Sequence, residues 1–190
     1  VSSESSSAIP VCNMAAGPSA APRDLPPRSN GAAINSTMSG QVYSVHYRSM
    51  ACGVLGIQGD FAMHLEAIRR ADPGVEGRLV KTPKDLETVD RLIIPGGEST
   101  TVGMLLNRFS LDQAICDRVN GGMPIWGTCM GMILLAAEIE GSQQPRLNLI
   151  DITVRRNAFG AQVHSFEDEV AVKGIAEDHL AVFIRAPIVT

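Results

Sequence analysis

Residues 125–136 read IWGTCMGMILLA, and they decide the fold because a short apolar run changes there into a helical pattern. The run that ends near Gly127 has the length of a buried strand, and the apolar residues after Met130 are typical of a buried helix. The turn between them carries Cys129, with a glycine two residues away on each side. Because a strand followed directly by a helix is the repeating unit of α/β proteins, this stretch predicts an α/β fold with a cysteine at the turn.

The same alternation continues on both sides of this stretch. Buried strands are expected at CGVLGIQG (52–59), RLVK (78–81) and PIWGTC (124–129), and DRLIIPGGEST (90–100) is expected to be a strand that ends in a glycine turn. Helices are expected after Asp60, at TPKDLETV (82–89), around 101–107 and 111–120, and at MGMILLAAEI (130–139), with Asp60 and Thr82 as N-caps. This order predicts a three-layer α/β sandwich with a mostly parallel sheet. The later runs LIDITV (149–154), AQVHSF (161–166), EVAV (169–172) and LAVFIRAP (180–187) predict a small added β section.

Composition excludes several classes of function. The formal net charge of −4 provides no basic field for nucleic acid, so no nucleic-acid partner is expected. No apolar run reaches the roughly 18 residues that span a bilayer, so no membrane partner is expected. The four cysteines, at positions 12, 52, 116 and 129, form no CxxC pair and have no metal-like histidine spacing. We therefore expect reduced thiols, a cytoplasmic location and no metal or cofactor.

Residues 1–49 differ in composition from the rest of the chain. They are rich in Ser, Pro, Ala and Gly and show no helical or strand period, which is typical of a disordered segment. Two explanations are open, a targeting leader that resembles a transit peptide, or an artefact ahead of a natural start at Met50. Residues 50–190 are expected to form one domain.

Cys129 lies in the pattern of a nucleophile elbow. Gly127-Thr128-Cys129-Met130-Gly131 has the form G-x-nucleophile-x-G on a strand-to-helix turn. The nucleophile of an elbow has a strained backbone, and the glycines let neighbouring backbone approach without a clashing Cβ. The start of the following helix favours the thiolate, and the Met130 N–H can donate to an oxyanion. The alternative is a small buried cysteine at a strand end.

The stretch PGGEST (95–100) ends the preceding strand. Its doubled glycine, at the carboxyl edge of the sheet, offers backbone N–H groups to a ligand. It is closer to an oxyanion loop than to a phosphate loop, because the Walker lysine is absent. The alternative is a tight turn with Glu98 in solvent. One strand before the elbow, the stretch predicts the second half of an active site.

Five stretches together resemble the class I glutamine amidotransferase (triad glutaminase) family. They are GVLGIQGDFAMH, LIIPGGESTT, WGTCMGMILLA, DITVRRNAFGAQVHSFE and VFIRAP, and they span residues 53–187. Within the family, they are most similar to glutaminase subunits of pyridoxal 5′-phosphate (vitamin B6) synthase. Glutaminases of purine, tryptophan and histidine synthesis usually have Gln where this chain has Ile133, and they lack RNAFG and FIRAP.

The resemblance implies a flavodoxin-like fold and a reaction. Cys129 attacks the carboxamide of L-glutamine, a γ-glutamyl thioester forms, and ammonia passes to a separate synthase subunit. Gly97 and Met130 supply the oxyanion donors, and Gln58 helps to order that loop. The implied glutamine-binding residues are Gly96, Gly97, Glu98, Arg156, Ile184 and Arg185. Two arginines suit an α-carboxylate, although surface solvation is the alternative for both.

The family's catalytic base comes from a His-Pro-Glu stretch near its C-terminus, and this chain has none. We therefore expect residues 50–190 to be an incomplete glutamine amidotransferase domain, either a fragment or a natural truncation. The four histidines, His46, His64, His164 and His179, are expected to be ordinary, with His64 on the exposed side of the first helix. Met130 replaces a small family residue and is expected to crowd the substrate.

Two rival functions remain. One is a catalytically dead pseudo-glutaminase that only binds the synthase subunit. The other is a cysteine hydrolase of the related protease/chaperone group, which shares the elbow but is disfavoured by PGGEST and FIRAP.

Overall fold

The computed structural model describes residues 36–38, 41–43, 50–174 and 176–190. The disorder expected for residues 1–49 falls mostly outside the described residues. Within that segment the structure has two short strands, β1 (Ser36–Met38) and β2 (Gln41–Tyr43), which pair antiparallel. No helix in the described ranges is long and apolar enough to cross a membrane.

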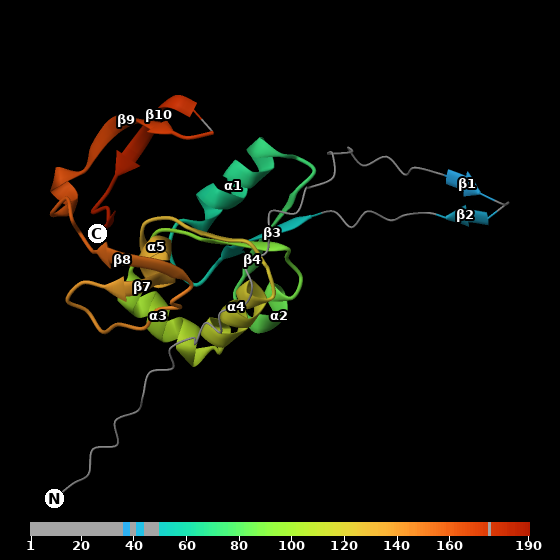
Figure 1. Cartoon of the computed structure of the whole chain (residues 1–190), viewed down its shortest axis with the longest axis horizontal. Coiled ribbons are helices and arrows are strands. Elements are labelled where there is room, and N and C mark those ends of the chain that lie inside the picture. The colour runs from blue at the N-terminus through green and yellow to red at the C-terminus, as the bar shows by residue number, and fades with distance from the viewer. Residues whose placement is uncertain (1–35, 39–40, 44–49, 175) are drawn as a thin grey trace, which may run out of the picture.

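A four-stranded parallel sheet forms the centre of the fold (Figure 1). Its strands are β3 (Ala51–Leu55), β4 (Glu76–Val80), β5 (Arg91–Ile94) and β6 (Ile125–Gly127), in the order β4-β3-β5-β6. Ile94 at the end of β5 lies opposite Gly127 at the end of β6. This register places the PGGEST turn and the cysteine turn side by side, at the carboxyl edge where ligands bind in parallel sheets.

Helices lie on both sides of this sheet, as the sequence predicted. They are α1 (Phe61–Ala71), α2 (Pro83–Leu86), α3 (Ser99–Arg108), α4 (Leu111–Asn120) and α5 (Met130–Leu135). Figure 1 shows α1 on one side of the strands and α2, α3 and α4 on the other. Both predicted N-caps are confirmed, since Asp60 accepts a hydrogen bond from the Met63 N–H and Thr82 forms a capping box with Asp85. The main core packs apolar side chains of β3, β5, α3, α4 and α5 together.

The helix expected over MGMILLAAEI is too long by four residues. The helix α5 ends at Leu135, and Ala136 turns extended to begin β7 (Ala136–Ile139). This strand pairs in parallel with β8 (Ile150–Arg155), which also pairs antiparallel with β11 (Ile188–Val189). A continuous apolar run does not distinguish a buried helix from a buried strand, so the boundary was not visible in the sequence.

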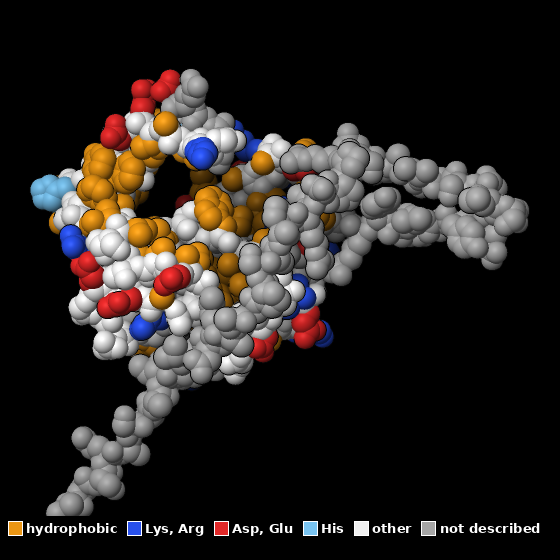
Figure 2. Space-filling model, viewed as in Figure 1, with side chains coloured by type: hydrophobic (Ala, Val, Ile, Leu, Met, Phe, Trp, Pro, Cys, Tyr) orange, Lys and Arg blue, Asp and Glu red, His pale blue; other side chains and the backbone are white. Residues whose placement is uncertain are grey.

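The added β section exists but differs in detail from the expectation. The hairpin β9 (Phe166–Val172) and β10 (Ala176–Phe183) confirms the strands at EVAV and LAVF. The stretch AQVHSF is instead a short 3-10 helix, η1 (Gln162–His164), and a turn. Figure 2 shows apolar side chains gathered along this hairpin, next to an opening between it and the rest of the molecule. The strand β6 is also less buried than predicted, because Trp126 is 59% exposed.

Candidate functional site

The cysteine turn has the backbone geometry of an elbow. Cys129 adopts φ 49° and ψ −105°, a strained conformation for a residue with a Cβ. A Cβ on Gly131 would lie 2.2 Å from the Ile94 carbonyl oxygen, and one on Gly127 would lie 2.4 Å from the Gly131 carbonyl carbon. The Thr128 N–H donates to the Ile94 carbonyl at 3.0 Å, which ties the elbow to β5. Both glycines are therefore required for steric reasons.

The thiol of Cys129 is exposed, whereas Cys52 and Cys116 are buried. Burial raises the pKa of Cys52, and nearby Arg91 opposes that shift only in part. The alternative reading of Cys129 as a small buried cysteine is therefore wrong. Among the described residues, Cys129 is the cysteine that a ligand can reach.

The Gly96–Gly97 turn lies directly against the elbow. A Cβ on Gly96 would lie 3.6 Å from the Cys129 Cβ, and one on Gly97 would lie 3.2 Å from the Met130 Cε. In the described part of the chain, no hydrogen-bond acceptor is assigned to the backbone N–H of Gly97 or of Met130. Two such donors beside an exposed thiol are the groups from which an oxyanion site is built.

Met130 does not crowd the exposed side of the site. Its side chain is fully buried in the main core, and its terminal methyl group lies beneath Gly97. The expectation of crowding is wrong because the helical turn directs the side chain inward. The methyl group instead supports the oxyanion turn from below.

The GIQG stretch braces the same turn from the other side. The Glu98 N–H donates to the Gln58 Oε1 at 3.2 Å. Gly59 has φ +101°, and a Cβ there would lie 1.8 Å from the Gly96 carbonyl oxygen. These contacts support the predicted role of Gln58 in ordering the loop, and they explain the glycine that follows it.

Glu98 is the N-cap of α3 and does not simply face solvent. Its carboxylate accepts hydrogen bonds from the Thr100 N–H at 3.1 Å and the Thr101 N–H at 2.6 Å. Partial burial alone would raise its pKa, but the hydrogen bonds from Thr101 and Thr100 outweigh burial and lower the pKa to about 2. Glu98 is therefore negatively charged at neutral pH.

Arg156 joins Glu98 at the start of α3. It follows β8 directly, and its Nη2 lies 3.5 Å from the Glu98 Oε1. Its Nη1 donates to the Gln144 Oε1 at 2.5 Å and lies 3.4 Å from the Thr100 Oγ1. The structure thus brings together PGGEST and RRN, as the predicted site requires. Gln144 was missed, because a glutamine in a polar loop carries no sequence signal for burial.

Ile184 and Arg185 lie in the turn after β10, and both side chains are exposed. Arg185 has φ 45°, and Asn157 in the turn after β8 has φ 50°. The Ala158 N–H donates to the Ala186 carbonyl at 3.1 Å, so the two turns lie side by side. Within the described residues, no hydrogen bond or ion pair joins the Arg185 side chain to Glu98 or Cys129. In the described part of the chain, this backbone hydrogen bond is what places FIRAP near Arg156.

The four histidines have different surroundings. His64 is half-buried, and its Nε2 lies 3.4 Å from the Thr128 Oγ1, next to the nucleophile. Its ring meets Trp126 edge to face, and burial lowers its pKa against the opposing charge of Asp60. The expected exposed position of His64 is therefore wrong. His164 lies beside Gly160, His179 is exposed on β10, and His46 falls outside the described residues.

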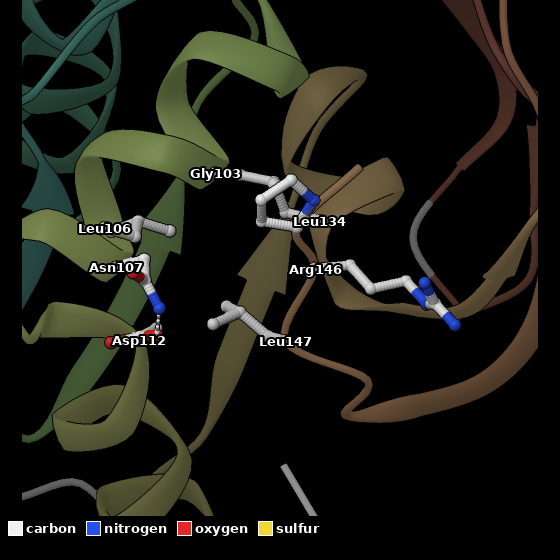
Figure 3. Close-up of a pocket in the computed structure, with 8 residues that line it drawn as sticks. Gly103, Leu106, Asn107, Asp112, Leu134, Arg146 and Leu147 are labelled. Carbon is white, nitrogen blue, oxygen red and sulfur yellow. Dashed lines mark hydrogen bonds between the residues drawn. The ribbon is translucent and has the colours of Figure 1, made fainter. Parts of the chain in front are cut away.

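The described residues contain no cluster of three or more His, Cys, Asp or Glu side chains that could hold a metal ion. A small, shallow hollow lies between α3 and the loop after β7 (Figure 3). It is lined by Gly103, Leu106, Asn107, Asp112, Leu134, Pro145, Arg146 and Leu147. None of the predicted site residues lines this hollow.

Comparisons with known proteins identify a family, similar sequences and a similar solved structure. The profile of the SNO glutamine amidotransferase family matches residues 54–190. A pyridoxal 5′-phosphate synthase subunit PdxT of Desulforamulus reducens is 51% identical over 139 residues, and that of Thermotoga maritima is 48% identical, each over 73% of both chains. A solved structure described as a glutamine amidotransferase superimposes with a TM-score of 0.68 at 45% identity, over 73% of this chain and 72% of that chain.

Proposed function

Because the chain belongs to the SNO glutamine amidotransferase family, we propose that it is a glutaminase that hydrolyses L-glutamine and supplies ammonia for pyridoxal 5′-phosphate synthesis. One observation supports this proposal above all others. The exposed Cys129 lies on a strained elbow against the Gly96–Gly97 turn, with two backbone N–H groups beside it.

The proposed chemistry begins at the Cys129 sulfur. The thiolate attacks the carboxamide carbon of glutamine, and the carbonyl electrons move onto the oxygen. The N–H groups of Gly97 and Met130 stabilise this oxyanion. When the carbonyl re-forms, the C–N bond breaks, the nitrogen takes a proton and leaves as ammonia, and a γ-glutamyl thioester remains. Water then cleaves the thioester to give glutamate and the free thiol.

The charged groups beside α3 suit the other end of glutamine. The Arg156 guanidinium can bind the α-carboxylate of a free amino acid, and the nearby Glu98 carboxylate is charged at neutral pH. In this proposal Arg185 and Ile184 complete the site from the adjacent turn. The strained backbone of Arg185 supports a functional position for this turn.

Among the described residues, no group is identified as the donor of the proton for the departing ammonia. The 190 residues contain no His-Pro-Glu, and the histidine at the elbow, His64, lies against Thr128. General acid–base help is typically worth about 10²–10⁴-fold. We propose that proton transfer to the departing ammonia contributes on this scale, and that the chain acts in the cytoplasm with a separate synthase subunit.

A glutamine-analogue electrophile, such as a γ-diazoketone of glutamine, tests the proposal. We expect saturable labelling of Cys129, protection by L-glutamine, and no labelling of Cys129→Ala. Labelling that persists in Cys129→Ala, or that glutamine does not slow, would contradict the assignment.

The second candidate is a pseudo-glutaminase that binds the synthase subunit without turnover. Ammonia release measured with and without the synthase subunit separates the two. Turnover above the rate of Cys129→Ala supports the glutaminase. Binding of the synthase subunit with no turnover supports the pseudo-glutaminase.

A further inference from the structure

The loop after β7 is packed firmly against two helices. The Leu147 N–H donates to the Leu134 carbonyl at 2.7 Å, and the Arg146 Nε donates to the Ala137 carbonyl at 2.7 Å. A Cβ on Gly103 would lie 2.7 Å from the Pro145 carbonyl oxygen, so the loop lies directly on α3. Figure 3 shows Leu147 on this loop directed towards the side of Asn107 and Asp112, whereas the Arg146 side chain extends away from them. The part of the loop that follows Gln144 is therefore held in place by these contacts.

Gln144 is 8% exposed, and its amide oxygen collects hydrogen bonds from the site. Its Oε1 accepts from the Arg156 Nη1 at 2.5 Å, the Thr100 Oγ1 at 3.1 Å and the Ser99 Oγ at 3.4 Å. Because a guanidinium carries only donors, Arg156 dictates which end of the amide faces it.

The other end of the amide is left unsatisfied. In the described part of the chain, the buried Gln144 Nε2 has no hydrogen-bond partner. A buried donor without a partner is unfavourable for stability, so folding alone does not explain a glutamine here. The Gln144 Oε1 is therefore the functional atom of this side chain, and Arg156 makes the shortest contact with it.

The acceptor that Gln144 offers to Arg156 also carries no charge. The Glu98 carboxylate, which is the charged neighbour of Arg156, is engaged by two N–H groups of α3 and lies 3.5 Å away. An amide oxygen holds the guanidinium without adding a second negative charge. The positive charge of Arg156 is then only partly compensated within the protein.

We propose that Gln144 is a positioning residue, which holds the Arg156 guanidinium through a neutral acceptor so that it can receive the α-carboxylate of glutamine. This inference rests on the proposed function. It gives the loop after β7 a part in substrate affinity, although the loop itself does not touch the reacting atoms.

The test is covalent labelling of Cys129 by the γ-diazoketone analogue of glutamine. The labelling rate is measured against the analogue concentration, which gives a half-saturating concentration for reversible binding and a maximal rate for the covalent step. In Gln144→Met, which keeps the side-chain length but removes the acceptor, the half-saturating concentration should rise about 10- to 100-fold, the range for losing a hydrogen bond to a charged group. The maximal labelling rate should change little, and so should alkylation by iodoacetamide, which has no α-carboxylate. Gln143→Met is the matched control, since Gln143 is the exposed neighbour in the same loop.

A second variant shows whether Gln144 acts through Arg156. Adding Gln144→Met to Arg156→Gln should raise the half-saturating concentration no further than Arg156→Gln alone. Equal half-saturation in Gln144→Met and the unsubstituted chain would overturn the inference and leave the proposed function intact. If the unsubstituted chain shows no saturable labelling, both are overturned. A melting curve on each variant verifies folding. If the effects of the two substitutions on the half-saturating concentration multiply in the double variant, the inference is also overturned.

Discussion

Substitution of Gly131 by alanine tests the contact that joins the two halves of the site. The new Cβ would lie 2.2 Å from the Ile94 carbonyl oxygen and 3.0 Å from the Ile94 Cβ. Real Cβ contacts are essentially never shorter than 3.0 Å, so the elbow and β5 must separate by at least about 0.8 Å in a close-packed interior. Ile94 leads directly into the Gly96–Gly97 turn, so the displacement moves the oxyanion donors relative to the thiol.

The size of the effect follows from overpacking. Inserting a methyl group into a packed site typically costs about 1–3 kcal/mol. For a domain of this size, each kcal/mol lowers the melting temperature by about 2–4 °C, so we expect a decrease of roughly 2–12 °C. Displacement by close to 1 Å can reduce a reaction rate by about 10²-fold, so the maximal labelling rate of Cys129 should fall by that order.

The assay combines thermal unfolding followed by circular dichroism with labelling by the glutamine analogue. Gly74→Ala is the matched control, because Gly74 is exposed and the nearest atom to its new Cβ is the Asp72 Oδ1 at 3.2 Å. We expect it to stay within about 0.5 kcal/mol of the unsubstituted chain. A Gly131→Ala chain with unchanged melting temperature and labelling rate would refute the steric account of the elbow.

Three further predictions concern charge and chain length. Glu98→Gln should lower the melting temperature at neutral pH, and the difference should shrink as pH falls from about 4.5 towards 2, because a depressed carboxylate pKa stabilises the fold only while the group is ionised; a pH-independent difference contradicts this. Gln144→Glu keeps the acceptor but neutralises Arg156, so half-saturation by the analogue should rise without a lower melting temperature, whereas half-saturation equal to that of the unsubstituted chain shows that neutrality is unimportant. A chain that starts at Met50 should melt within about 2 °C of the full chain, because each ~1 kcal/mol of stability shifts the melting temperature of a domain of this size by about 2–4 °C; a larger decrease shows that residues 1–49 contribute.

Local patterns predicted the parts of the fold that they specify. The capping box at Thr82 and the glycine-bounded turn at Cys129 each depend on residues within a few positions, so both could be inferred from sequence. The helix boundary at Leu135 could not, because helix and strand were both buried and the pairing of β7 with β8 decided between them. Tertiary contacts, rather than local preference, set that boundary.

The site divides in the same way. The elbow and the PGGEST turn could be predicted because their chemistry requires glycines at fixed spacing. Gln144 and the position of His64 could not, because burial of a polar side chain depends on which loop or helix packs over it. The hydrogen bond between His64 and Thr128 joins residues 64 positions apart, and no local pattern records it.

The hairpin β9–β10 has a consequence for the timing of substrate binding. Its strands pair mainly with each other, and a cluster of three rings, Phe159, Phe166 and Phe183, connects it to the turn after β8. Amide hydrogens of such an element exchange with solvent through local openings, at lower free energy than those of the central strands. The turn that carries Arg185 follows β10 directly. Each local opening of the hairpin therefore displaces Arg185 from the proposed glutamine site and leaves the elbow intact. The apparent affinity for glutamine then equals the intrinsic affinity multiplied by the fraction of time for which the hairpin is closed.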